Sequence, residues 1–185
     1  MRIQQIITDR VVIRCYQASD AQLLKNAIDE SLPELKLWMP WAIGEPQTLE
    51  QKQLLVNRFA EDFKNGVDYS FAILNLAQTE LLGSTGLHTR LEPTAREIGY
   101  WIHSRHTGKG LATHVVQALT QVAFLHENIQ RLEIRCHMQN MASQRVAIKA
   151  GFTPKNSIDN FNVYEWTAAA YRKFPPPSMP LVISQ

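Results

Sequence analysis

The segment Arg105–Thr113, RHTGKGLAT, sets two glycines around a lysine at the point where the pattern of apolar residues changes. Residues 97–102 before it (EIGYWI) have the composition of a strand, and residues 111–127 after it (LATHVVQALTQVAFLHE) carry apolar side chains at helical spacing. A glycine-rich turn from a strand into a helix leaves the first N–H groups of the helix unpaired at the positive end of its dipole. Such a turn can bind a phosphate or diphosphate. The alternative is an ordinary left-handed turn with two solvated cations, and the glycines alone do not decide between them.

Strand-like and helix-like segments alternate irregularly along the chain. Strands are predicted over residues 11–16, 69–74, 81–90, 96–103, 131–137, 152–158 and 161–167. Helices are predicted over residues 19–32, 48–66, 111–126, 140–150 and 168–174. Capping-box spacing supports two of the helix starts, Ser19-x-x-Gln22 and Thr48-x-x-Gln51, and three prolines mark residues 33–46 as irregular. The order predicts an α+β fold with a mixed, mostly antiparallel seven-stranded sheet flanked by helices on both faces.

Size and composition indicate one globular domain. The chain has 185 residues, of which 45% are hydrophobic and 19% charged, so it can bury a core. We expect a single domain over residues 1–174 and a Pro-rich tail over residues 175–185. The tail is expected to be extended, and then loose or docked on a neighbour through the apolar residues 179–183.

The charge pattern, the apolar runs, the cysteines and the histidines indicate which partners, location and metal content to expect. The net charge is only +2 and the basic residues are scattered, so neither a nucleic acid nor a membrane is an expected partner. A cytoplasmic location is expected, because no apolar run approaches a membrane span and the first residues lack the apolar part of a secretory signal. Cys15 and Cys136 each lie in a strand-like run and are expected to be reduced core thiols. The six histidines show no metal-ligand spacing, so no metal is expected.

Three known schemes for binding phosphate can be compared with the loop. A Walker loop needs Ser or Thr after its Gly-Lys, and here Lys109 is followed by Gly110. A dinucleotide fingerprint needs a small residue where Thr113 stands and a parallel β-α-β unit around the loop. The third scheme, Arg/Gln-x-x-Gly-x-Gly/Ala between a fourth strand and a long helix, is matched in full by Arg105, Gly108 and Gly110.

Further short motifs accompany the loop in a fixed order along the chain. They are WMPW at 38–41, GSTGL at 83–87, EIGYWI at 97–102, Asn140-x-x-Ser143 and Gly151-Phe152. With these motifs the chain resembles the GNAT superfamily of acetyl-CoA-dependent N-acetyltransferases, and within it the RimJ/RimL-like branch. The resemblance covers nearly the whole chain, from Arg10 to Thr167. It implies acetyl-CoA in a V-shaped opening between the strands that end at His103 and His137, with its pyrophosphate on the loop amides.

The resemblance also implies which residues contact acetyl-CoA. Asn140 is expected to hold the pantetheine arm, and Ser143 to hydrogen-bond the sulfur, although an Asn at a helix start can equally be an ordinary cap. The implied set comprises Tyr100, Trp101, Ile102, Arg105, Thr107, Gly108, Lys109, Gly110, Leu111, Ala112, Asn140 and Ser143.

Amide formation from a thioester requires a neutral amine, hydrogen-bond donors that stabilise the oxyanion, and a proton for the departing thiolate. Glu97 is the predicted base, acting directly or through water, and its alternative is an exposed strand carboxylate. Many members of the superfamily carry a tyrosine acid seven residues after the Asn, where this chain has Ala147. Ser143 or Tyr164 is therefore the predicted acid, and a backbone N–H near Trp101 is the predicted oxyanion donor.

Trp38, Trp41 and Tyr69 are predicted to line the acceptor pocket, with plain core packing as the alternative. The leading functional hypothesis is an N-acetyltransferase that acts on a primary amine, such as the N-terminal α-amine of a protein or ribosomal protein. A small-molecule amine, a non-catalytic acyl-CoA-binding or interaction module, and an NAD-dependent enzyme are the alternatives. The sequence leaves the choice between monomer and homodimer open.

Overall fold

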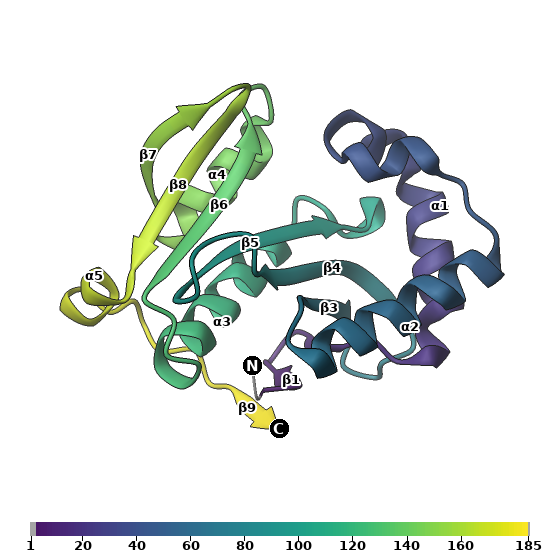
Figure 1. The fold of residues 1–185 in the computed structure, drawn as a ribbon, viewed down its shortest axis with the longest axis horizontal. Helices are drawn as coiled ribbons and strands as arrows, with labels where there is room; N and C mark the ends of the chain where they lie inside the picture. Colours follow the sequence, from purple (N-terminus) through teal and green to yellow (C-terminus); the bar gives the residue numbers. More distant parts are fainter. Residues whose placement is uncertain (1–2, 185) are drawn as a thin grey trace.

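A computed structural model describes residues 3–184, which fold around one nine-stranded sheet with helices on both faces (Figure 1). The sheet order is β7-β8-β6-β5-β4-β3-β2-β1-β9. Its strands are β1 (Gln5–Ile7), β2 (Val12–Cys15), β3 (Tyr69–Leu74), β4 (Leu81–His88), β5 (Ala95–Ile102), β6 (Arg131–His137), β7 (Thr153–Ile158), β8 (Phe161–Thr167) and β9 (Val182–Ser184). The helices are α1 (Ala21–Trp38), α2 (Leu49–Asn65), α3 (Leu111–His126), α4 (Met141–Ala150) and α5 (Ala168–Lys173), with 3₁₀ turns η1 (Ala18–Asp20), η2 (Pro40–Gly44) and η3 (Ser104–His106). The predicted α+β class is confirmed.

The prediction of seven strands is wrong by two, both at one edge of the sheet. β1 pairs antiparallel with β2, and β9 pairs antiparallel with β1. Each has three residues, too few for an alternating pattern to stand out in the sequence.

The end of the predicted tail lies on its own chain. Met179, Leu181 and Ile183 pack against the core, and Gln121 of α3 exchanges two hydrogen bonds with the backbone of Met179. The prediction of a loose or partner-docked end is therefore wrong for residues 179–184. Residues 1, 2 and 185, which belong to the predicted domain and tail, lie outside the described residues.

Two apolar clusters cover the two faces of the sheet. α3 contributes eight buried residues, among them Val115, Leu119 and Val122, to the larger cluster. α1 and α2 bury Leu24, Ile28 and Val56 in the smaller cluster on the opposite face. Because the faces are covered by separate elements, the central strands β3 and β4 are almost entirely buried.

Local capping decides where α1 and α2 begin. The predicted capping box of α2 is confirmed, since the Thr48 and Gln51 side chains each accept from the other's backbone N–H, at 3.2 and 2.8 Å. The predicted box at Ser19 is wrong, because the Asp20 carboxylate accepts from the Gln17 N–H at 2.7 Å and is held by Arg14.

The segment predicted to be irregular, residues 33–46, is helical in its first part. α1 continues through Pro33 to Trp38, and η2 covers residues 40–44. This extension carries the WMPW motif out beyond the sheet.

Every neighbouring pair of strands is antiparallel except β5 and β6. These two are parallel, and they pair only over Ala95–Glu97 and Arg131–Glu133. Beyond those residues β5 continues to Ile102 and β6 to His137 without pairing, so the sheet opens into a V (Figure 1).

Cys15 and Cys136 are free thiols, as predicted. Among the described residues, no helix is long and apolar enough to cross a membrane.

Candidate active site

A cavity of about 830 Å³ lies over the opening between β5 and β6. Its walls come from α1, η2 and α2 on one side, and from β6, the start of α4 and the turn between β7 and β8 on the other. Of the predicted site residues, it brings together Trp38, Trp41, Glu97, Tyr100, Trp101, Asn140 and Ser143. Residues that lie more than a hundred positions apart in the sequence therefore share one concave surface.

Glu97 lies at the vertex of the V, on the last pair of residues that joins β5 to β6. Its side chain is largely buried, with 9% of the residue exposed. One carboxylate oxygen accepts from Arg90 Nη1 at 3.0 Å, and the other lies 3.8 Å from Arg135 Nε. The alternative of an exposed strand carboxylate does not hold, because the group is buried and lies between two guanidinium groups.

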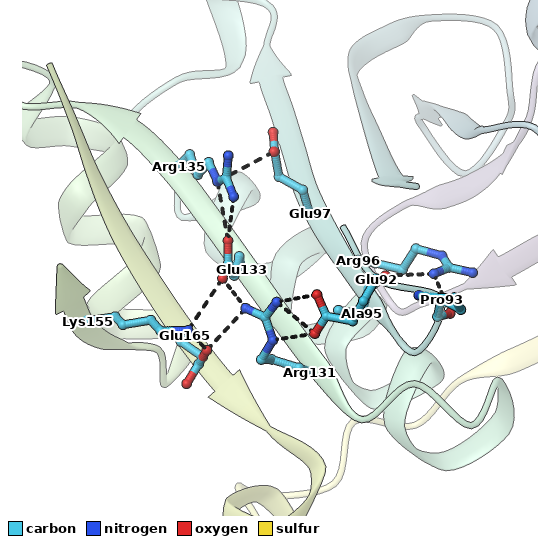
Figure 2. Close-up of polar contacts among 10 residues, drawn as sticks. All are labelled: Glu92, Pro93, Ala95, Arg96, Glu97, Arg131, Glu133, Arg135, Lys155 and Glu165. Carbon is cyan, nitrogen blue, oxygen red and sulfur yellow. Dashed lines mark hydrogen bonds and ion pairs between the residues drawn. The ribbon is translucent and has the colours of Figure 1, made fainter. Parts of the chain in front are cut away.

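An ion-pair network holds this vertex together (Figure 2). Arg135 links Glu97 to Glu133, and Arg131 links Glu133 to Glu92 and Glu165. Burial raises the pKa of Glu133, but the hydrogen bonds from Arg135 and Arg131 lower it more, so the net shift is downward. The network thus fixes β6 against β5 where their backbone pairing ends.

Ser143 and Tyr100 join the two sides of the opening. The Tyr100 and Ser143 hydroxyls are 2.8 Å apart, and the Tyr100 hydroxyl also donates to the Ser143 carbonyl at 3.2 Å. Burial raises the pKa of the Tyr100 phenol well above its usual value, so the hydroxyl keeps its proton. Sequence reasoning assigned Tyr100 only to cofactor binding and had no signal for this pair of hydroxyls.

Asn140 is an N-cap of α4, since its side-chain oxygen accepts from the Ser143 N–H at 3.0 Å. The side-chain oxygen of Asn140 therefore acts as an ordinary helix cap, the alternative considered for this residue. Asn140 also lines the cavity.

Tyr164 and Tyr69, two other predicted site residues, are not among the residues that line the cavity. Tyr164 is 4% exposed, and its hydroxyl donates to Gln144 Oε1 at 3.3 Å. Tyr69 is 6% exposed, and its ring packs edge-on against Phe63. Both belong to the larger apolar cluster, so the core alternative describes Tyr69.

Aromatic rings line the cavity on both sides of the V. Trp41 lies 6.2 Å from Trp101, and Trp38 lies 5.8 Å from His137, both measured between ring centroids. His137 in turn lies 5.8 Å from Phe161 of β8. The sequence pointed to Trp38 and Trp41, but His137 and Phe161 come from the far side of the V and join them only in the fold.

The glycine loop runs from the end of β5 into α3. Gly108 and Gly110 both have left-handed φ values, 73° and 72°, and a Cβ added to Gly108 would meet no atom within 4 Å. Gly110 is the N-cap of α3, and no side chain in residues 3–184 caps this helix end. The first N–H groups of α3 and an open approach to the backbone suit a diphosphate, so the loop fits the pyrophosphate of a coenzyme A.

The two cations of the loop have partners within the protein. Arg105 Nη2 lies 2.5 Å from a carboxylate oxygen of Glu30 on α1, and Lys109 Nζ donates to the Arg105 carbonyl at 3.0 Å. Arg10 donates to the Lys109 carbonyl at 2.9 Å. These contacts order the loop, so the backbone amides are its best-placed anion donors.

Two polar pairs in the cavity wall were missed by sequence reasoning. One is the buried pair of Lys52 and Glu45, and the other is His88 with Asp68, 2.7 Å apart. Neither pair has a characteristic spacing, and each joins residues from different elements.

Comparisons with known proteins agree with this architecture. The model of the acetyltransferase (GNAT) domain matches residues 10–153. The probable N-acetyltransferase YjcK of Bacillus subtilis is 29% identical over 118 residues, which are 63% of this chain and 65% of that protein. The ribosomal-protein-serine acetyltransferase of Escherichia coli is 27% identical over 128 residues, which are 63% of this chain and 66% of that protein. The aligned part therefore spans slightly less than two thirds of each of these two relatives.

Solved structures share the fold. The ribosomal α-N-protein acetyltransferase RimL in complex with coenzyme A superposes with a TM-score of 0.79 at 22% identity, covering 89% of this chain and 97% of that one. The microcin self-immunity acetyltransferase MccE, in complex with acetyl-CoA and AMP, gives 0.77 at 19% identity, covering 86% and 93%. Because the domain match extends over most of the chain and the splayed strands and glycine loop lie where that fold requires them, the chain belongs to the GNAT acetyltransferase family.

Proposed function

We propose that the protein transfers the acetyl group of acetyl-CoA to a primary amine. The observation that carries this proposal is the single cavity that joins the opening between β5 and β6 to the hydroxyls of Tyr100 and Ser143. The relatives named as N-acetyltransferases and the structural neighbours solved with coenzyme A or acetyl-CoA support the choice of donor.

In the proposed complex, the amides at the start of α3 bind the pyrophosphate, with Leu111 and Ala112 as the first donors. Thr107, Gly108 and Gly110 shape the turn, while Arg105 and Lys109 support it. The pantetheine arm then lies along Tyr100–Ile102, whose backbone is unpaired on the β6 side, and Asn140 holds it from the opposite wall.

The acceptor site is the part of the cavity walled by Trp38, Trp41 and Trp101. An N-terminal α-amine with a pKa of about 7.7 to 8.0 costs about 1 kcal/mol to neutralise at pH 7, whereas a lysine near 10.4 costs about 4 to 5 kcal/mol. We therefore propose a peptide α-amine as the acceptor class, which agrees with the description of the structural neighbour RimL as an α-N-protein acetyltransferase. The cytoplasmic location and the choice between monomer and homodimer stay predictions.

Glu97 occupies the floor of this site. We propose that its negative charge draws the ammonium form of the acceptor into the cavity. The prediction that Glu97 itself takes the proton is untested, and the contacts of both its oxygens with arginines argue against it.

The proposal predicts that thiol is released from acetyl-CoA only when a suitable amine is added. Initial rates of thiol release should saturate with acetyl-CoA, and peptides with a free N-terminal residue should give the highest kcat/KM in a panel of peptides, free amino acids and polyamines. Peptides with a blocked N-terminus are the control. Tight binding of acetyl-CoA without turnover of any amine would contradict the proposal and indicate a non-catalytic module.

The hydroxyl pair predicts a second result. A thiolate is a good leaving group, with a thiol pKa of about 8.5 for the cysteine side chain, so an acid gains only about tenfold in rate. Ser143→Ala and Tyr100→Phe should each lower kcat about tenfold, and the double variant should lose little more, because the two hydroxyls act as one unit. Steady-state kinetics of Tyr164→Phe provide the comparison, since a tenfold loss in that variant alone would move the acid to Tyr164.

A further inference from the structure

His88 and Asp68 form a hydrogen-bonded pair in the wall of the cavity. His88 is the last residue of β4, and Asp68 directly precedes β3. His88 Nδ1 lies 2.7 Å from Asp68 Oδ2, and Asp68 Oδ1 accepts from the Thr89 N–H at 3.1 Å. The two side chains are 16% and 30% exposed, so the pair is held in place yet open to the cavity.

The carboxylate decides which ring nitrogen carries the proton. Burial raises the pKa of Asp68, but the hydrogen bond and charge of His88, together with the N–H groups of Thr89 and Tyr69, lower it more, so the net shift is downward. An ionised carboxylate can only accept, which makes Nδ1 of His88 the donor. In the neutral ring, the lone pair therefore lies on Nε2.

Two glycines let this ring lie against the backbone of the acetyl-donor strand. A Cβ added to Gly99 of β5 would lie 2.8 Å from His88 Nε2, and one added to Gly86 of β4 would also lie 2.8 Å from it. Gly99 directly precedes Tyr100 and Trp101, along which we place the donor. Within residues 3–184, Nε2 has no hydrogen-bond partner, so its lone pair is available beside that strand.

Glu97 is the cross-strand partner of His88 in the register of β4 and β5, so the two side chains are neighbours on one face. The two side chains differ in the groups that they contact. The Glu97 oxygens face Arg90 and Arg135, whereas His88 lines the cavity and its Nε2 has no hydrogen-bond partner among residues 3–184.

Resting on the proposed acetyl transfer, we propose that His88 is the catalytic base for the acceptor amine and that Asp68 is a positioning residue that holds its ring. The amine nitrogen forms its bond to the thioester carbonyl carbon, its surplus proton passes to His88 Nε2, and the C–S bond breaks. The departing thiolate takes a proton from the hydroxyl pair of Tyr100 and Ser143. The imidazolium then releases its proton to solvent, and the hydroxyl pair takes up a proton from solvent. The net reaction converts amine and thioester into amide and thiol.

Both positively and negatively charged groups line the cavity that contains His88. Asp68 favours the imidazolium that forms, and Glu97 adds negative charge across the strand pair. The other charged groups that line the cavity are Lys52, Arg58 and Asp62 of α2, Glu45 after η2, Arg90 after β4, Arg135 of β6, and Asp159 between β7 and β8. A protonated Nε2 has no lone pair left to accept the proton of the amine, so the proposed step requires the neutral ring.

The experiment measures log(kcat/KM) against pH with the best peptide acceptor. At low pH, the slope for the unaltered chain should be about 2, because both the amine and His88 must lose a proton. In His88→Gln the slope should fall to about 1, and kcat/KM at neutral pH should fall about a hundredfold. Glu97→Gln should keep the slope of about 2. His126→Gln, which removes an exposed imidazole at the end of α3, is the control and should match the unaltered chain.

Two further variants separate chemistry from structure. Asp68→Asn preserves the shape, but its amide donates to Nδ1 and moves the ring proton to Nε2, so kcat should fall at least tenfold while the dissociation constant of acetyl-CoA stays within twofold. Added imidazole should restore part of the rate to His88→Ala and none to Ser143→Ala.

A slope of about 2 in His88→Gln, or an Asp68→Asn variant with unaltered kcat, would overturn this inference while leaving the proposed acetyl transfer intact. If His88→Gln fails to bind acetyl-CoA, Asp68→Asn and the imidazole rescue decide the outcome. No turnover by the unaltered chain would overturn the proposed function, and this inference with it.

Discussion

Replacing Glu45 by alanine lowers the free energy of unfolding by about 3 to 5 kcal/mol. Glu45 pairs with Lys52, and the two side chains are 3% and 0% exposed. The second Glu45 oxygen accepts from the Gln47 N–H at 2.9 Å, so the carboxylate is satisfied in place. Removing it leaves an ammonium group buried without an opposite charge, which costs far more than the contact itself contributes. Urea denaturation followed by circular dichroism measures the change.

Two controls test whether buried charge is the cause. The double variant Glu45→Leu with Lys52→Met removes both charges, and it should recover most of the lost stability, because an apolar pair of similar volume can replace a buried ion pair. Asp29→Ala breaks the more exposed pair with Lys25 and should cost at most about 1 kcal/mol. If Glu45→Ala loses no more than Asp29→Ala, the explanation by an unpaired buried charge is wrong.

Gly108→Glu should abolish the binding of acetyl-CoA at micromolar concentrations. A carboxylate about 4 Å from a phosphate charge opposes it by about 4 kcal/mol at the effective dielectric constant of a protein surface, which is about a thousandfold in the dissociation constant. Gly108 lies where a side chain meets no protein atom, so the variant can fold with its carboxylate in the path of the diphosphate. Isothermal titration with acetyl-CoA measures the loss.

Gly108→Ala is the matched control for this result. It shares the strain of a side chain at a φ of 73°, which costs about 1 to 2 kcal/mol of folding stability, but it adds no charge. Its dissociation constant should rise about tenfold or less. Equal affinities in the Ala and Glu variants would contradict the placement of the diphosphate on this loop.

Features that depend on neighbours in the sequence could be predicted well. The capping box of Thr48 and Gln51, the glycine turn into α3 and the hairpin that turns at Asp159 are all present as expected. Each depends on the conformational preference or hydrogen bonding of a few consecutive residues, so the chain nearby contains all the information. The short strands β1 and β9 lack that kind of signal, since their stability comes from pairing between opposite ends of the sequence, such as Gln5 with Ser184.

The candidate site likewise contains features that the sequence predicts locally and features that depend on distant contacts. Composition, periodicity and the motif Arg105-x-x-Gly108-x-Gly110 were enough to predict the fold class, the glycine turn before α3 and the placing of Asn140 and Ser143 on one turn of helix. They were not enough to place Tyr164 and Tyr69 in the core, to bring Tyr100 to Ser143, or to set His88 on Asp68 over Gly99. Such contacts arise from the register of paired strands and from the angle at which β6 leaves β5, and both are properties of packing between distant segments. The conformation of the loop could therefore be read locally, whereas the contacts of the groups that we propose to move protons depend on the tertiary fold.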